Sequence, residues 1–255
     1  MDAAERDSKK AVQLDAGNAI AYNNLGLIAV DRHRWEAGMA NYSKAIGLDP
    51  DYEKSYLNRG ILRHLRGDLD GAKIDFDKAI ELVPDYTQAY IERGFLHFDQ
   101  HDLTGAEQDS RRAIALDPEN GTAYNNLGLV LRERTQIEEA LAAFDNAIRV
   151  SPKYARAYLN RGETRYRQGD RTGALADFEK AIEVASKEAW GYNDRGWARR
   201  TRDDFEGAIA DFKKALELDP NYKKARINLN EALAAKSAAE QRNPRPRADT
   251  GAQPR

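Results

Sequence analysis

The sequence has no cysteine among its 255 residues, which excludes disulfide bonds, cysteine nucleophiles and thiolate metal sites. It also lacks an excess of charge of either sign, because the formal net charge is −2. A dedicated nucleic-acid binder needs a basic face to displace phosphate counterions, so we expect no nucleic-acid partner. The sequence contains no phosphate-binding glycine loop and no metalloprotease motif, so we expect no cofactor.

Long apolar runs are missing as well. No stretch approaches the length that crosses a bilayer, and we therefore expect no membrane insertion. The first residues form no hydrophobic signal segment, so the sequence as written predicts a cytoplasmic protein. A signal or lipoprotein segment upstream of Met1 would instead place the protein in a bacterial periplasm, where adaptor solenoids also occur.

What the sequence does contain is a repeat with a step of 34 residues and no insertion. A fixed period of this length is typical of a stack of identical supersecondary units, each of which buries its apolar face against its neighbours. Six full copies are found, at residues 19–52, 53–86, 87–120, 121–154, 155–188 and 189–222.

We number the positions of each repeat from 1 to 34. Position 4 is always tyrosine, position 8 is always glycine and position 27 is always alanine, as in Tyr22, Gly26 and Ala45. Position 24 is aromatic except at Ser110, and position 32 is proline except at Ser186. Positions 4, 7, 8 and 11 form the apolar stripe of one helix, and positions 20, 24 and 27 form that of a second.

Between the two stripes lie helix breakers such as Gly67-Asp68 and Gly169-Asp170, in which glycine can take a positive φ and aspartate can cap the next helix. Glycine at position 8 costs about 1 kcal/mol of helix propensity relative to alanine. We expect this glycine to let the two helices approach closely, with the small alanines of positions 20 and 27 opposite it.

This pattern of an aromatic residue, glycine, small alanines, a second aromatic residue and a closing proline resembles the tetratricopeptide repeat family. The resemblance covers residues 1–236. It implies an all-α, right-handed superhelical solenoid of antiparallel helix pairs, in which the first helix of each pair lines a concave face.

The two ends of the chain depart from the full repeat. Residues 1–18 match only the second half of a repeat, so they are either a capping helix or the start of a fragment cut from a longer protein. Residues 223–236 match only the first half and predict a polar capping helix. Residues 237–255 predict a disordered tail rich in proline and arginine. Such a basic tail could touch RNA or an acidic partner, although we favour a plainly solvated tail.

Position 6 carries asparagine in four repeats and in the terminal copy. One asparagine side chain offers one acceptor and two donors at short reach, enough to hold both polar groups of a peptide unit. The column resembles the asparagine ladder in the repeat region of O-linked N-acetylglucosamine transferases, which implies a concave face that binds extended peptide. The alternative is that asparagine is common here in the family and holds no ligand. The five residues are Asn24, Asn58, Asn126, Asn160 and Asn228.

Glu92 and Asp194 interrupt this column and would favour a ligand with lysine or arginine at those points. Neighbouring positions 2, 9 and 12 carry large aromatic residues that are candidate anchors for a partner, because aromatics dominate interface energetics. Some of them could instead contact the next repeat. The anchor candidates are Phe95, Phe98, Trp190 and Trp197.

Arginine at position 7 occurs only in repeats that have aspartate at position 23, whereas Leu25 and Leu127 face Asn41 and Ala143. This match predicts a largely buried ion pair between the two helices of a repeat. The order of the two repeat types also suggests that repeats 1–3 were duplicated into repeats 4–6. The predicted structural pairs are Arg59 with Asp75, Arg93 with Asp109, Arg161 with Asp177, and Arg195 with Asp211.

No catalytic site emerges from the sequence. His97 and His101 are four residues apart, but His101 falls in a predicted turn and no third ligand is evident, so we predict neither a metal site nor an enzyme. The sequence predicts a scaffold or adaptor that binds another protein, as an extended segment in the concave groove. The alternative is the regulatory or substrate-recruiting region of a larger enzyme. The sequence identifies neither the partner nor the oligomeric state.

Overall fold

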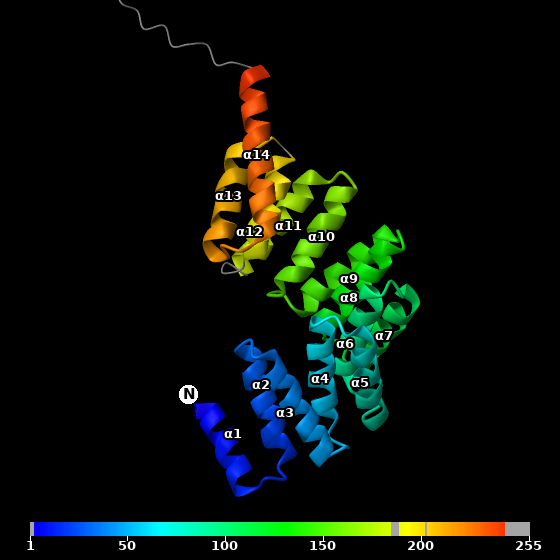
Figure 1. The fold of residues 1–255 in the computed structure, drawn as a ribbon. Coiled ribbons are helices and arrows are strands. Elements are labelled where there is room, and N and C mark those ends of the chain that lie inside the picture. Colours follow the sequence, from blue (N-terminus) through cyan, green and yellow to red (C-terminus); the bar gives the residue numbers. More distant parts are fainter. Residues whose placement is uncertain (1–2, 185–188, 202, 243–255) are drawn as a thin grey trace, which may run out of the picture. The chain divides into compact units, whose positions relative to one another are not determined.

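The computed structural model describes residues 3–184, 189–201 and 203–242. These residues contain fourteen helices and no strand, so the all-α prediction is confirmed (Figure 1). The chain divides into two compact units, Met1–Val150 and Ser151–Arg255, each of which is a stack of helix pairs.

The first unit holds nine helices within its described residues. After the single helix α1, each repeat contributes one first and one second helix, which pack against each other. The helices are α1 (Ala3–Leu14), α2 (Ala19–Asp31), α3 (Trp35–Leu48), α4 (Glu53–Leu65), α5 (Leu69–Leu82), α6 (Thr87–Asp99), α7 (Leu103–Leu116), α8 (Gly121–Glu133) and α9 (Ile137–Val150).

The second unit follows the same plan in its described residues, with two helix pairs and one last first-type helix. The position-32 exception Ser186 lies outside the described residues. The helices are α10 (Ala155–Arg167), α11 (Arg171–Val184), α12 (Ala189–Arg200), α13 (Phe205–Leu218) and α14 (Lys223–Arg242).

The last helix is longer than the sequence predicted, because α14 runs to Arg242 instead of ending at residue 236. The predicted disordered tail therefore begins with six helical residues, and its remainder lies outside the described part of the chain. Alanine, glutamate and glutamine in residues 237–242 are good helix formers.

The turns inside the repeats have the predicted chemistry. Gly67 has a φ of 83°, and the carboxylate of Asp68 accepts a hydrogen bond from the backbone N–H of Gly71 at 3.0 Å. Asp170 caps α11 in the same way through Gly173 at 2.8 Å. An N-terminal cap satisfies one of the backbone donors that a helix start leaves without a partner.

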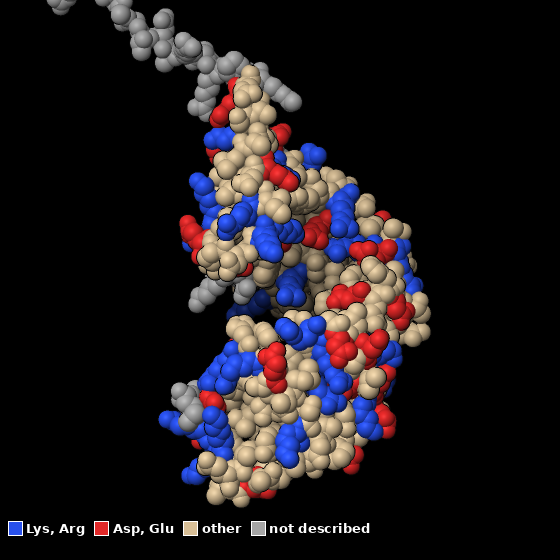
Figure 2. Space-filling model, viewed as in Figure 1, with Lys and Arg blue, Asp and Glu red and all other residues tan. Residues whose placement is uncertain are grey.

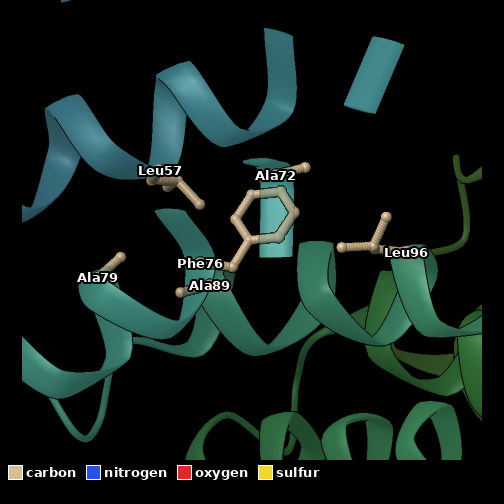
Figure 3. Packing of buried hydrophobic residues seen from close by; sticks show 6 residues of the cluster. All are labelled: Leu57, Ala72, Phe76, Ala79, Ala89 and Leu96. Carbon is tan, nitrogen blue, oxygen red and sulfur yellow. The ribbon is translucent and has the colours of Figure 1, made fainter. Parts of the chain in front are cut away.

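The core of each repeat except the third contains a buried aromatic ring at position 24. Phe76 is completely buried, and Figure 3 shows its ring among Leu57 of α4, Ala72 and Ala79 of α5, and Ala89 and Leu96 of α6. Phe76, Phe178 and Phe212 thus join the two helices of their own repeats to the first helix of the next. In the third repeat Ser110 takes this place, and its hydroxyl donates to the carbonyl of Ala106 at 2.7 Å.

The glycine at position 8 allows the expected close approach of the two helices, but the side chain that it faces is this ring. The position-20 alanine contributes a backbone carbonyl, as Ala208 does 3.1 Å from a Cβ placed on Gly196. A Cβ placed on Gly128 would lie 2.5 Å from the ring of Phe144, and one on Gly26 would lie 2.4 Å from the ring of Tyr42. Position 8 is therefore glycine because an aromatic ring occupies the space of its side chain. Only at Gly94, opposite Ser110, is the nearest side-chain atom as far as 3.2 Å, at the Cβ of Asp109.

Candidate functional site

In each unit, the first helices of neighbouring repeats contact one another directly. In the first unit α2 contacts α4, α4 contacts α6 and α6 contacts α8, and in the second α10 contacts α12, which contacts α14. No two second helices in the described residues make such a contact. The first helices therefore lie on the inner side of the curvature within each unit, where the resemblance placed the candidate binding face.

Three of the five predicted asparagines are bound to the preceding repeat. The amide of Asn58 donates to the Oδ1 of Asn23 at 2.9 Å, and that of Asn228 donates to the Oδ1 of Asn193 at 2.9 Å. The amide of Asn126 donates to the carbonyl of Ile91 at 3.4 Å. Each bond joins position 6 of one repeat to position 5 of the repeat before it.

These bonds give the asparagine column a structural role that the sequence interpretation missed. Asn126 and Asn228 are buried, while Asn58 and Asn160 are half-buried, so little of their surface faces the groove. Asn24 in the first repeat is exposed. The signal was present in the sequence, since Asn23 and Asn193 at position 5 are each followed 35 residues later by a position-6 asparagine.

The two acidic residues of the column each have a leucine at position 5 of the preceding repeat. Glu92 comes 35 residues after Leu57, and Asp194 comes 35 residues after Leu159, so position 5 of the preceding repeat offers these carboxylates no side-chain amide. Burial raises the pKa of Glu92, which accepts a hydrogen bond from Gln88 at 2.6 Å. Burial also raises the pKa of Asp194 to about 6, although Lys224 and Asn193 act in the opposite direction.

The predicted anchors in the first unit lie on α6. Phe95 is 36% exposed, and its ring lies 5.6 Å from that of His64 on α4, between centroids. His64 in turn contacts the carboxylate of Asp99 at 2.8 Å, and Phe98 is half-buried. Phe95 and His64 thus form an aromatic surface across two neighbouring first helices.

The anchors in the second unit lie on α12, where Trp190 and Trp197 are both half-buried. The Trp197 ring meets that of Tyr166 on α10 edge to face, with 4.4 Å between centroids. The two rings line a pocket of about 360 Å³ between α10, α12 and α14. The remaining lining residues are Glu163, Arg167, Phe178, Asp194 and Lys224.

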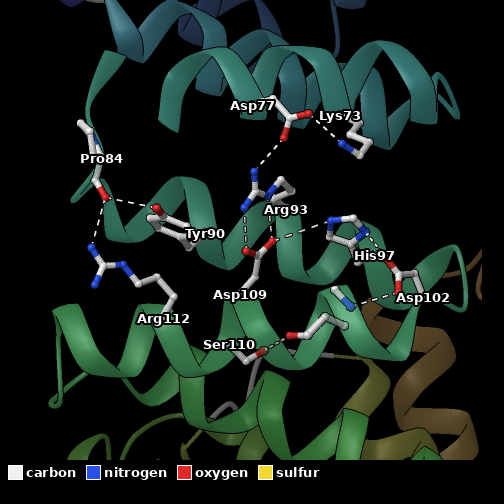
Figure 4. Close-up of polar contacts among 12 residues, drawn as sticks. Lys73, Asp77, Pro84, Tyr90, Arg93, His97, Asp102, Asp109, Ser110 and Arg112 are labelled. Atoms are coloured by element: carbon white, nitrogen blue, oxygen red, sulfur yellow. Dashed lines mark hydrogen bonds and ion pairs between the residues drawn. The ribbon is translucent and has the colours of Figure 1, made fainter. Parts of the chain in front are cut away.

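All four predicted arginine–aspartate pairs are present, each with two parallel hydrogen bonds of 2.5 to 3.0 Å. Each arginine also lies over the tyrosine three residues before it in the same helix, as Arg93 does over Tyr90 at 5.5 Å. Figure 4 shows Arg93 between Asp109 of its own repeat and Asp77 of the preceding one. The four pairs join the two helices of a repeat, and Arg93 also reaches the preceding repeat.

The pairs include a partner that the sequence interpretation did not assign. The arginine at position 11 donates to the same aspartate, as Arg63 does to Asp75 and Arg165 to Asp177, both at 2.8 Å. In the third repeat His97 takes this position, and its ring contacts Asp102 at 2.9 Å and lies 3.9 Å from Asp109 (Figure 4).

The two candidate histidines lie in different elements, because His97 is on α6 and His101 is in the turn that follows it. His101 has a φ of 60° in the connection between α6 and α7, while His97 faces the aspartates. Among the described residues no three histidine, cysteine or acidic side chains gather as metal ligands would.

Basic and acidic side chains are interspersed on the face that Figure 2 shows, in keeping with the net charge near zero. No helix in the described part of the chain is both long and apolar enough to cross a bilayer.

Comparison with known proteins shows the repeat independently. Models of the tetratricopeptide repeat match residues 23–87, 111–142 and 153–221, and a further TPR repeat model matches residues 128–169. No curated protein matches the sequence.

Solved structures share the fold at low sequence identity. A tetratricopeptide repeat protein from Parabacteroides merdae ATCC 43184 is 22% identical with a TM-score of 0.75, and the match covers 90% of this chain and 91% of that one. A chain of the APC/C hetero-tetramer Cut9-Hcn1 is 18% identical with a TM-score of 0.78, covering 89% of this chain. Yeast Tom70 is 23% identical with a TM-score of 0.73, covering 94% of this chain. The chain spans only 45% of the first of these two longer proteins and 51% of the second.

Proposed function

Since the chain belongs to the tetratricopeptide repeat family, we propose that it is a scaffold whose first helices bind an extended segment of a partner protein. One observation carries the proposal. Large apolar side chains stand exposed at groove positions of the first helices, among them Ile20, Leu27 and Phe95. Exposed apolar groups gathered on one face, with polar groups between them, mark an interaction surface.

The polar groups suited to an extended backbone are fewer than a continuous ladder would supply. Asn24 is exposed beside Ile20, where it lines a shallow hollow with residues of α1. Asn58, Asn126 and Asn228 serve the contacts between repeats, so affinity would come chiefly from the apolar anchors. In this proposal the chain performs no catalysis of its own and needs no cofactor.

Surface variants test the proposal with a matched control. The tagged chain carrying Leu27→Ser and Phe95→Ser should lose capture of its partner from an extract of the source organism. Ile74 is 66% exposed but lies on the second helix α5, so Ile74→Ser should leave capture unchanged. Equal capture by the groove double variant and the wild type, with unchanged circular dichroism, would contradict a first-helix binding face.

A further inference from the structure

In the pocket between α10, α12 and α14, the acidic lining residues are more buried than the basic ones. Asp194 is only 8% exposed and Glu163 is half-buried, whereas Arg167 and Lys224 are exposed. The interior of the pocket is therefore acidic, and its basic residues stand at the rim. A buried carboxylate has lost its water and gains most from a cation that enters the same space.

The carboxylate of Asp194 has only partial compensation from its neighbours. The amide of Asn193 donates to its Oδ1 at 2.8 Å. The ammonium of Lys224 lies 3.7 Å from the same oxygen, beyond hydrogen-bond distance, and the lysine side chain is 62% exposed. The preceding repeat offers Leu159 where it offers Asn193 to Asn228, so it supplies no amide to Asp194 from that position.

The pocket walls suit the same kind of ligand. The rings of Tyr166 and Trp197 line it, and aromatic rings attract ammonium and guanidinium groups as well as the methylene stems that carry them. The pocket also lies at groove positions 2, 6, 9 and 12 of neighbouring first helices, on the face that we assign to the partner segment.

We propose that this pocket binds the side chain of a lysine or arginine in the partner segment, with Asp194 and Glu163 as counter-charges and Tyr166 and Trp197 as aromatic walls. The inference rests on the proposed function and assigns a residue class that the groove selects. Lys224 then acts as a competing internal cation, which the ligand displaces from Asp194.

Because Lys224 competes with the ligand for Asp194, substitutions of these two residues should have opposite effects on binding. Asp194→Asn keeps an acceptor for Asn193 and places at position 6 the residue that four other repeats already have, so it should fold. It removes the counter-charge and should weaken binding about tenfold, the worth of one charge-assisted hydrogen bond. Lys224→Met should strengthen binding, because the ligand no longer competes with it.

The probe is a blocked alanine pentapeptide with one central lysine, compared with the same peptide carrying arginine, norleucine or glutamate. Binding is followed through the indole N–H resonance of Trp197, which Trp197→Phe identifies by its loss. We expect a saturable shift with the lysine or arginine peptide and binding about tenfold weaker with norleucine, which keeps the apolar stem without the charge.

Matched controls lie on the far helix of the same repeat. Lys214 and Glu217 form an exposed i, i+3 pair on α13, so Lys214→Met and Glu217→Gln should change nothing. Equal binding of the norleucine and lysine peptides, preference for glutamate, or weaker binding after Lys224→Met would each overturn the proposal.

Acidification supplies an independent readout. Because burial raises the pKa of Asp194 to about 6, binding of the lysine peptide should weaken as the pH falls from 7.5 to 5. The part of this weakening that comes from protonation of Asp194 should be absent in Asp194→Asn. The comparison therefore separates the titration of Asp194 from that of its neighbours. The charged and titratable groups around it are Glu163, Tyr166 and Arg167 on α10, Lys224 on α14, and Tyr222 just before α14.

The two proposals fail separately. If the lysine peptide does not bind but Leu27→Ser with Phe95→Ser abolishes partner capture, the pocket assignment is wrong and the groove function stands. If the lysine peptide binds as described but those groove variants capture the partner normally, the pocket is real and the assignment of Leu27 and Phe95 to the partner site is wrong.

Discussion

The guanidinium of Arg161 on α10 donates two hydrogen bonds to the carboxylate of Asp177 on α11, at 3.0 and 2.5 Å. Arg165 donates a third to the same carboxylate at 2.8 Å. Asp177 is 3% exposed, so the shared carboxylate is shielded from water. The equivalent place in the fourth repeat is apolar, with Leu127, Leu131 and Ala143.

Removing the aspartate alone should be costly. Asp177→Ala leaves two arginines without their shared acceptor, and breaking a buried pair in this way costs about 3–5 kcal/mol. Because Arg161 and Arg165 keep some exposure to water, we expect a value near the lower end. The measurement is urea denaturation, fitted with a nearest-neighbour repeat model because repeat arrays need not unfold in two states.

Restoring the fourth-repeat combination should recover the loss. Arg161→Leu with Asp177→Ala still leaves Arg165 without its acceptor, so we expect only partial recovery. The triple variant that adds Arg165→Leu should recover most of it, since apolar replacements of a buried ion network are often neutral. Strictly additive losses would show that the three side chains do not interact, and that their co-occurrence is inherited from a duplication.

Two glycines at the same repeat position should respond differently to alanine. Gly128→Ala places a methyl group 2.5 Å from the ring of Phe144 and should destabilise by about 1–3 kcal/mol through overpacking. For Gly94→Ala the closest atom is the Cβ of Asp109 at 3.2 Å, followed by the Ala106 carbonyl at 3.5 Å, and the gain in helix propensity of about 1 kcal/mol offsets these contacts. Thermal unfolding of the two variants decides the matter, and equal losses would show that the ring is not the reason for the glycine.

The asparagines of the column should differ in how much they contribute to the free energy of unfolding. Asn58→Ala removes the hydrogen bond to Asn23 and should lower the free energy of unfolding by about 1 kcal/mol. Asn24 is exposed, so Asn24→Ala should change it by less than about 0.5 kcal/mol. Chemical denaturation of both variants is the test, and an equal effect of the two would argue against a bond between the repeats.

The buried carboxylate of Asp194 should make stability depend on pH. Its pKa of about 6 lies above the ordinary value of 3.8, so the folded chain holds the proton more tightly than the unfolded chain. The free energy of unfolding should therefore fall as the pH rises from about 4 to about 6, by up to about 3 kcal/mol. Glu92 contributes in the same direction, so the comparison is with Asp194→Asn, which should remove this share and be the more stable protein at pH 8. A wild type and variant with parallel pH profiles would contradict the shift.

The sequence was sufficient to predict much of this fold, because six copies at one period provide internal comparisons. The match of Arg93 with Asp109, for example, needs only the pairing of two repeat positions. The contact of Gly128 with Phe144 was not predicted, since a period shows that two positions are small or aromatic but not which atoms meet. The role of Asn58 was missed because its partner lies in the previous repeat, outside the unit in which the pattern was compared.

The acidic pocket was only partly predictable. The sequence singled out Asp194 as a break in the column and anticipated a basic ligand there. Its depth depends on how Tyr166, Trp197 and Lys224 of three successive first helices pack around it, and no single repeat contains that information.

The central claim is that the first-helix face, and not the outer second-helix face, receives the partner. Site-specific photocrosslinking tests it most directly, with a benzophenone amino acid placed at Leu27 or Phe95 and, as the control, at the equally apolar and more exposed Ile74. We expect covalent adducts with one partner protein from Leu27 and Phe95, mapping to a short contiguous segment of that partner, and none from Ile74. Adducts from Ile74 with none from Leu27 or Phe95 would contradict the account.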